Sequence, residues 1–77
     1  MTADLKYAVE QRLRLIDFLV AHYGSINRGA LVDYFGISMP QASNDIGAYI
    51  ERAPDNLSYD RKAKTYVRAS SFVRVWP

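Results

Sequence analysis

The sequence predicts a domain of the α+β class that is mainly helical, with three helices and a C-terminal β-hairpin arranged as a winged helix-turn-helix. Three observations predict this fold. Apolar residues recur at helical spacings of three and four over about the first 20 residues. Residues 26–46 have the pattern of two helices joined by a tight turn. After Pro54, two short runs of alternating polarity enclose a charged turn, which is typical of a hairpin.

The first helix is expected from about Ala3 to His22. Thr2 or Asp4 can cap its start, and Gly24 ends it. Its apolar stripe consists of Leu5, Ala8, Val9, Leu13, Ile16, Leu19 and Val20, and it is widened by Tyr7, Leu15 and Phe18. A helix this apolar is expected to bury a second face, either under the C-terminal segment or against a partner.

A short edge strand is expected at Ser25-Ile26, and Asn27 is the expected N-cap of the second helix. The inner face of that helix, which ends at about Phe35, is formed by Leu31, Tyr34 and Phe35. The turn that follows is Gly36-Ile37-Ser38. Its glycine can adopt the left-handed conformation that ends a helix, and its serine is a good N-cap for the next one.

The third helix is expected from about Met39 to Arg52, because Pro40 suits a first helical turn and Pro54 stops a helix. The residues that point inward at helical spacing are Ala42, Ile46, Tyr49 and Ile50. Those on or near the outward side are Gln41, Ser43, Asn44, Gly47, Ala48 and Glu51. The outward side therefore offers mostly small and polar side chains to a ligand.

The expected hairpin pairs residues 57–59 with residues 65–67 around the charged turn 60–64. Tyr59 and Tyr66 are expected to pack within the hairpin. Residues 1–77 are expected to form one domain, of which residues 68–77 are an apolar and basic tail. The apolar tail residues are Phe72, Val73, Val75 and Trp76. Such a tail either packs back on its domain or begins a linker to a domain that is absent here.

Composition excludes several classes of protein. The 77 residues contain no cysteine, so disulfides and cysteine-ligated metals are excluded, and an intracellular setting is the simpler interpretation. The sequence has neither a membrane-spanning run nor a signal-peptide pattern, which predicts a cytoplasmic protein. Its single histidine, His22, is expected to be a helix-end residue. With no metal-ligand cluster and no phosphate-binding glycine loop, the sequence predicts no enzyme, no cofactor and no small-molecule ligand.

The charge is unevenly distributed along the chain. Residues 61–77 carry five basic residues and no acidic one, whereas the first 60 residues carry five basic and eight acidic residues. A basic C-terminal segment suggests contact with a polyanion, although a solvated tail is the alternative.

The helix-turn-helix predicts binding to double-stranded DNA, with the third helix in the major groove. The candidate contact residues of this helix and its cap are Ser38, Met39, Pro40, Gln41, Ser43 and Asn44. Gln41 and Asn44 can each pair bidentately with adenine, and Met39 or Pro40 can contact a thymine methyl group. Arg28 is the candidate phosphate anchor at the start of the second helix. The wing candidates are Arg61, Lys62 and Lys64.

Asp45 is expected either to orient a neighbouring arginine or to cap locally, rather than to face phosphate. The exposed front of the third helix has no cation before Arg52, so binding must draw on Arg28, the wing and also Arg12 or Arg14. One copy is therefore expected to bind weakly, and a homodimer on a palindromic operator is the natural arrangement. The rival interpretation is a winged helix that binds another protein and no DNA, which the apolar tail and the weakly basic third helix favour.

Taken together, residues 12–18, 24–28, 31–43 and 56–67 resemble the N-terminal winged helix of WYL-domain transcriptional regulators, in particular regulators of bacterial phage-defence loci. The most specific stretches are Phe-Gly-Ile-Ser-x-Pro-Gln-Ala-Ser and Tyr-Asp-x-x-x-Lys-x-Tyr. This resemblance implies a homodimeric repressor that binds promoters. It assigns recognition-helix contacts to Ser38, Met39, Gln41, Ser43 and Asn44 and wing contacts to Arg61, Lys62 and Lys64. Members of the family continue into a ligand-sensing domain and a dimerisation domain. In this chain the candidate dimer surfaces are the first helix and residues 72–76.

Overall fold

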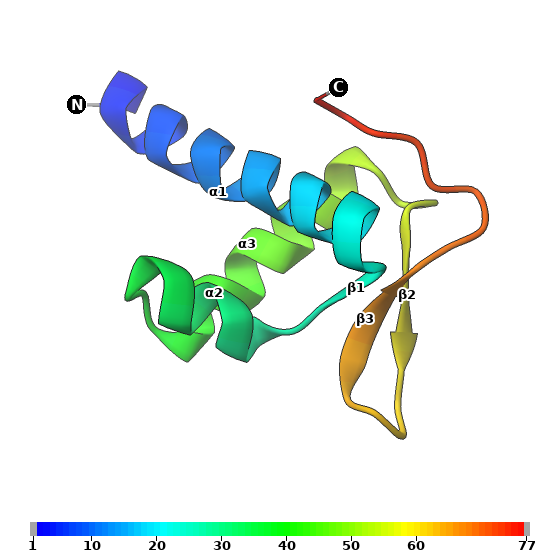
Figure 1. The fold of residues 1–77 in the computed structure, drawn as a ribbon. Helices are drawn as coiled ribbons and strands as arrows, with labels where there is room; N and C mark the ends of the chain where they lie inside the picture. The colour runs from blue at the N-terminus through cyan, green and yellow to red at the C-terminus, as the bar shows by residue number, and fades with distance from the viewer. Residues whose placement is uncertain (1, 77) are drawn as a thin grey trace.

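The computed structural model describes residues 2–76, with side chains from residue 7 onward. The elements follow the predicted order: α1 (Thr2–Tyr23), β1 (Ser25–Ile26), α2 (Arg28–Phe35), α3 (Met39–Arg52), β2 (Leu57–Asp60) and β3 (Thr65–Arg68) (Figure 1). The winged helix-turn-helix is thus confirmed, with helix bounds within a residue of those expected. The expected caps Thr2 and Asp4 and the side chain of Leu5 lie outside the described side chains.

The core lies where α1 crosses α3 and where α2 and the sheet close the two ends. Its buried apolar residues are Leu13, Ile16, Val20, Ile26, Leu31, Ala42, Ile46, Tyr49 and Leu57. In α1 and α3 these residues recur at spacings of three, four or seven, so one face of each of these helices enters the core. The shorter helix α2 contributes Leu31. The single stripe predicted for α1 is confirmed at Leu13, Ile16 and Val20.

The predicted widening of that stripe is wrong at two residues. Tyr7 and Phe18 are 65% and 46% exposed, because α1 packs through one face and these rings lie beside it. Tyr34, predicted on the inner face of α2, is 70% exposed. Since α2 is a short helix that enters the core at Leu31, the Tyr34 ring instead packs edge-on against Phe35 at the surface, with ring centroids 5.1 Å apart.

Local capping sets the ends of the two helices of the helix-turn-helix. Asn27 Oδ1 accepts a hydrogen bond from the Ala30 amide at 2.9 Å, and Ser38 Oγ accepts one from the Gln41 amide at 3.2 Å. Gly36 ends α2 with φ 68°, in the left-handed region. These predicted caps are confirmed, and they fix the angle at which α3 leaves the turn.

The sheet has the strand order β1-β3-β2 and is antiparallel throughout. Tyr59 pairs with Tyr66, and Ile26 of β1 pairs with Tyr66 from the other side. In the turn between β2 and β3, the Asp60 carboxylate accepts hydrogen bonds from the Lys62 and Ala63 amides. The strand β2 ends at Asp60, one residue later than expected. Because β1 pairs with β3, the wing is joined to the helical body through β1.

The tail packs back on its own domain, as the first of the two predicted alternatives has it. Asn56 donates to the Val73 carbonyl at 2.8 Å and accepts from the Val73 amide at 3.0 Å. The Val75 and Trp76 amides both donate to the carboxylate of Asp17, which is fully buried in α1. In Figure 1 this segment returns from β3 toward α1.

Candidate nucleic-acid interface

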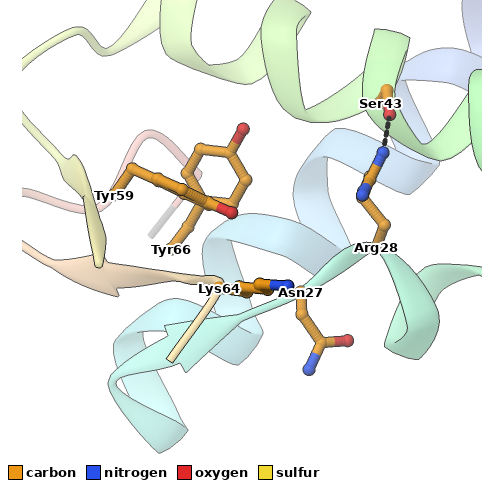
Figure 2. Close-up of a pocket in the computed structure, with 6 residues that line it drawn as sticks. All are labelled: Asn27, Arg28, Ser43, Tyr59, Lys64 and Tyr66. Atoms are coloured by element: carbon orange, nitrogen blue, oxygen red, sulfur yellow. Dashed lines mark hydrogen bonds between the residues drawn. The ribbon is translucent and has the colours of Figure 1, made fainter. Parts of the chain in front are cut away.

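A hollow of about 230 Å³ lies where the start of α2, the outer side of α3 and the wing meet (Figure 2). Its lining residues are Asn27, Arg28, Ser43, Tyr59, Lys64 and Tyr66. The hollow therefore brings together one cation from the helical body, one from the wing, and several hydroxyl groups. Such a set of donors suits a phosphate group.

Arg28 is held at this hollow by the local structure of α2. Asn27 caps the helix and Arg28 is its first residue, so the guanidinium lies beside α3. There Arg28 Nη1 donates to Ser43 Oγ at 3.2 Å, as Figure 2 shows. A guanidinium has five N–H donors, so this contact orients Arg28 while leaving it able to bind an anion.

The wing contributes to the hollow through its turn and its paired tyrosines. Lys64 has φ 54°, the left-handed conformation with which the turn re-enters β3. The rings of Tyr59 and Tyr66 are 4.8 Å apart, and Tyr59 is 49% exposed. Packing within the hairpin, as predicted, is therefore confirmed for this pair.

Sequence reasoning missed Asn27, Tyr59 and Tyr66 as residues of the site. The hairpin register was the available signal for the two tyrosines, because residues directly opposite each other in a hairpin share a face. That face is turned toward Arg28 and Ser43.

The predicted contact residues of α3 differ in their exposure and in the hydrogen bonds that their side chains already make. Met39, Pro40 and Asn44 are exposed, with Met39 at 48%. Ser38 is also exposed, but its hydroxyl already caps the helix. Gln41 is partly buried, and its side-chain amide donates to Asp45 Oδ1 at 2.9 Å.

The wing cations are separated within the structure. Arg61 and Lys62 are exposed in the turn, outside the hollow, while Lys64 lines it. Of the ten predicted contact residues, the structure thus brings Arg28, Ser43 and Lys64 into one hollow.

Asp45 is 1% exposed and lies on the buried side of α3, where Arg12 of α1 pairs with it through Nε and Nη2. The expectation that Asp45 orients an arginine is confirmed. In contrast, Arg12 was a wrong choice as a cation for the polyanion, because its side chain is 15% exposed and its charge is compensated. Arg14 lies 3.8 Å from Glu10 and over the Trp76 ring, away from the hollow.

A second buried carboxylate, Asp17, supports α3 from behind. Its oxygens accept hydrogen bonds from Tyr49 Oη of α3, from Arg74 Nε at 2.8 Å, and from the Val75 and Trp76 amides. Burial opposes ionisation of Asp17, but these donors outweigh it and hold its pKa below the ordinary value. Burial and the hydrogen bond to Asp17 raise the pKa of Tyr49.

Other site chemistries find little support in the described residues. Among the side chains of residues 7–76, no group of three or more His, Cys, Asp or Glu is placed to hold a metal ion. His22, as expected, lies at the end of α1, where it stacks on Phe18 with ring centroids 5.5 Å apart. None of the described helices is long and apolar enough to cross a membrane.

Comparison with known proteins adds an independent observation. The profile of the BrxR transcriptional regulator winged helix-turn-helix domain matches residues 8–76. A relative from Pseudomonas aeruginosa, named DNA-binding transcriptional repressor CapW, is 46% identical over 72 residues, which are 94% of this chain and 24% of the relative. Relatives with that name from Escherichia coli and Stenotrophomonas maltophilia are 44% and 38% identical over 71 residues, again 24% of their length. The chain thus spans about a quarter of the length of these relatives.

Proposed function

Because the chain belongs to the family of BrxR transcriptional regulator winged helix-turn-helix domains, we propose that it binds a specific double-stranded DNA sequence and represses transcription from it. The family is one of DNA-binding domains of transcriptional regulators, not of enzymes. This family agrees with the resemblance, seen in the sequence, to the N-terminal winged helix of WYL-domain regulators. The name of the CapW relatives supports both the DNA ligand and the repressor role.

The observation that carries this proposal is the hollow between α2, α3 and the wing. Arg28 and Lys64 contribute two positive charges to it, with the Tyr59 and Tyr66 side chains beside them. We assign this hollow to one phosphate of the DNA backbone. Ser43 keeps Arg28 oriented for that contact.

Base contacts in the major groove are assigned to the N-terminal half of α3. The proposed residues are Ser38, Met39, Pro40, Gln41 and Asn44. The amino end of this helix also carries positive dipole character, which favours a nearby phosphate. Arg61 and Lys62, exposed in the wing turn, are assigned to the flanking backbone or minor groove. A cytoplasmic location follows from this function.

The test is fluorescence anisotropy with pooled random duplexes at about 50 and 200 mM salt. Repeated selection and sequencing of the bound duplexes then gives the enriched operator. The wild-type chain is compared with a variant carrying Arg61→Ala, Lys62→Ala and Lys64→Ala, and with Arg14→Ala as a control that removes a cation distant from the hollow. We expect salt-sensitive binding that the triple variant weakens and the control does not. Absence of duplex binding at the lower salt would favour the rival function, a module that binds another protein.

We further propose that two copies bind a palindromic operator as a homodimer through α1. Phe18, His22 and Tyr23 form a contiguous aromatic cluster on this helix, and Tyr23 is 71% exposed. Exposed aromatic side chains are typical of protein interfaces. Sedimentation with the enriched operator should give two chains per duplex, and Phe18→Ala with Tyr23→Ala should reduce this to one. Tyr34→Ala removes an equally exposed ring from α2 and serves as the control.

A further inference from the structure

Gln41 departs from the capping pattern that its sequence context predicts. Ser38-Met39-Pro40-Gln41 has the spacing of a capping box, in which the glutamine side chain reaches back to the N-cap amide. Half of that box is present, since Ser38 Oγ accepts from the Gln41 amide. The Gln41 side chain is instead directed one turn forward, where its amide nitrogen donates to Asp45 Oδ1 at 2.9 Å.

Asp45 is itself held rigidly. Arg12 Nε and Nη2 contact its two carboxylate oxygens, and the carboxylate is almost completely buried. A buried ion pair is weak evidence for stability, because apolar side chains of similar size often serve equally well. Asp45 also accepts a hydrogen bond from Gln41, a candidate base-contact residue. The carboxylate can therefore act by orienting that side chain, apart from any effect on stability.

We infer that Asp45 is a positioning residue that makes Gln41 select adenine over guanine in the major groove. This inference rests on the proposed DNA binding. A glutamine amide has one acceptor and two N–H donors, and its two ends can exchange by rotation. A carboxylate accepts only from the nitrogen end, so Asp45 fixes the orientation of the amide and occupies one of its donors.

The consequence for base recognition follows from the donors and acceptors of the purines. Guanine presents two acceptors in the major groove, O6 and N7, and binding both requires two donors. Adenine presents the N7 acceptor and the N6 amino donor. The Gln41 amide, with one donor taken by Asp45, retains one donor and one acceptor, which is the set that matches adenine.

The experiment uses the full chain and the operator enriched in the binding test above. Each A·T pair of a half-site is replaced in turn by G·C, with adenine replaced by guanine, and the ratio of dissociation constants is measured. For the wild-type chain we expect a loss of about tenfold at one or two of these pairs. Gln41→Ala should abolish this preference, and Asp45→Asn should bring it close to unity. Combining the two should change the preference no further than Gln41→Ala does.

Glu51→Gln is the matched control, because it also removes a carboxylate from α3 but at an exposed residue near the other end of the helix. It should leave the tenfold preference intact. If Asp45→Asn weakens binding equally at every sequence and keeps the preference, Asp45 is only structural and the inference is wrong. If the wild-type chain binds no duplex at all, the proposed DNA binding fails and the inference fails with it. Binding without a preference for adenine would overturn the inference alone, so the two failures are distinguishable.

A second measurement requires no folded variant of Asp45. In nuclear magnetic resonance spectra of the free wild-type chain, the side-chain amide protons of Gln41 are assigned with Gln41→Ala. The proton donated to Asp45 should be shifted away from the value of a free glutamine amide and should exchange with water more slowly than a free amide proton does. Free-amide values for both protons would contradict the inference.

Discussion

Lys64 combines two properties in one residue, a backbone in the left-handed region and a cation at the hollow. A non-glycine residue in that region is strained by about 1–2 kcal/mol, and glycine is not. Lys64→Gly should therefore leave the free energy of unfolding unchanged or raise it by up to about 1 kcal/mol. It should also weaken DNA binding and lower the salt slope by about one.

Urea unfolding and anisotropy at several salt concentrations measure the two effects separately. Lys64→Ala is the control, since it removes the charge and keeps the backbone strain. Wild-type affinity in Lys64→Gly would show that Lys64 contacts no phosphate.

Asp17 is the residue on which the C-terminal segment and α3 converge, through Arg74 and Tyr49. Removing one partner from a buried set of this kind leaves the other donors unsatisfied. Asp17→Ala should lower the free energy of unfolding at pH 7 by about 3 kcal/mol. Asp33→Ala, which removes an exposed carboxylate from α2, should change it by less than about 0.5 kcal/mol.

The pH dependence of this loss has a definite sign. The pKa of Asp17 is lowered in the folded state, so the unfolded chain binds the proton first as pH falls. The stabilisation is fully present above the unfolded-state pKa of about 3.9 and is lost as pH falls through the lower folded-state pKa. The gap between wild type and Asp17→Ala should therefore narrow from pH 7 to pH 3 in urea unfolding. A constant gap would contradict the assignment.

At the scale of the elements, two glycines allow the same chemical change to be tested in opposite directions. Gly36 ends α2 with φ 68°, and Gly47 lies within α3, and a Cβ atom at either would meet open space. Gly36→Ala should destabilise by about 1–2 kcal/mol, because of backbone strain alone. Gly47→Ala should stabilise by about 0.5–1 kcal/mol, because alanine is the better helix former. Thermal unfolding of both variants checks the pair, and equal signs would refute the cap geometry.

The elements themselves were predictable because their signals are local. Asn27, Gly36 and Ser38 act within three or four residues of their own positions, so the sequence specifies the bounds of α2 and α3. It was harder to predict which aromatic residues are exposed. The periodicity that places Leu31 inside cannot show how far the packed face extends, and Tyr34 and Phe18 therefore proved exposed.

At the scale of the whole molecule, the sequence predicted some of the residues that line the candidate site but not their arrangement. Arg28 and Lys64 were expected to contact DNA, but their convergence on one hollow depends on the sheet that joins the wing to the body. The partners of Asp45 and Asp17 are 33 and 32 residues away in the sequence, at Arg12 and Tyr49. No local pattern encodes such pairings.

The wing is coupled to the body at the same scale. The Arg68 amide donates to the Gly24 carbonyl at 2.8 Å, and the Ala69 amide to the Asn56 carbonyl at 2.9 Å. The Arg68 guanidinium also donates to the Ala21 carbonyl at the end of α1. Amide hydrogen exchange at Arg68 should therefore require the same free energy of opening as at Gly24, which donates to Val20 within the body. Faster exchange at Arg68 would identify a wing that opens alone.

The two-residue strand β1 has a consequence for the length of the DNA site. By pairing with β3 it removes the freedom of the hairpin to swing as an arm, so the separation between α3 and the wing turn is fixed before any encounter. A protein with a mobile arm tolerates insertions between its two contact regions, because the arm adjusts. If α3 and the wing contact DNA as proposed, one base pair inserted between the two contacted segments should shift them out of phase around the double helix, and the body cannot compensate.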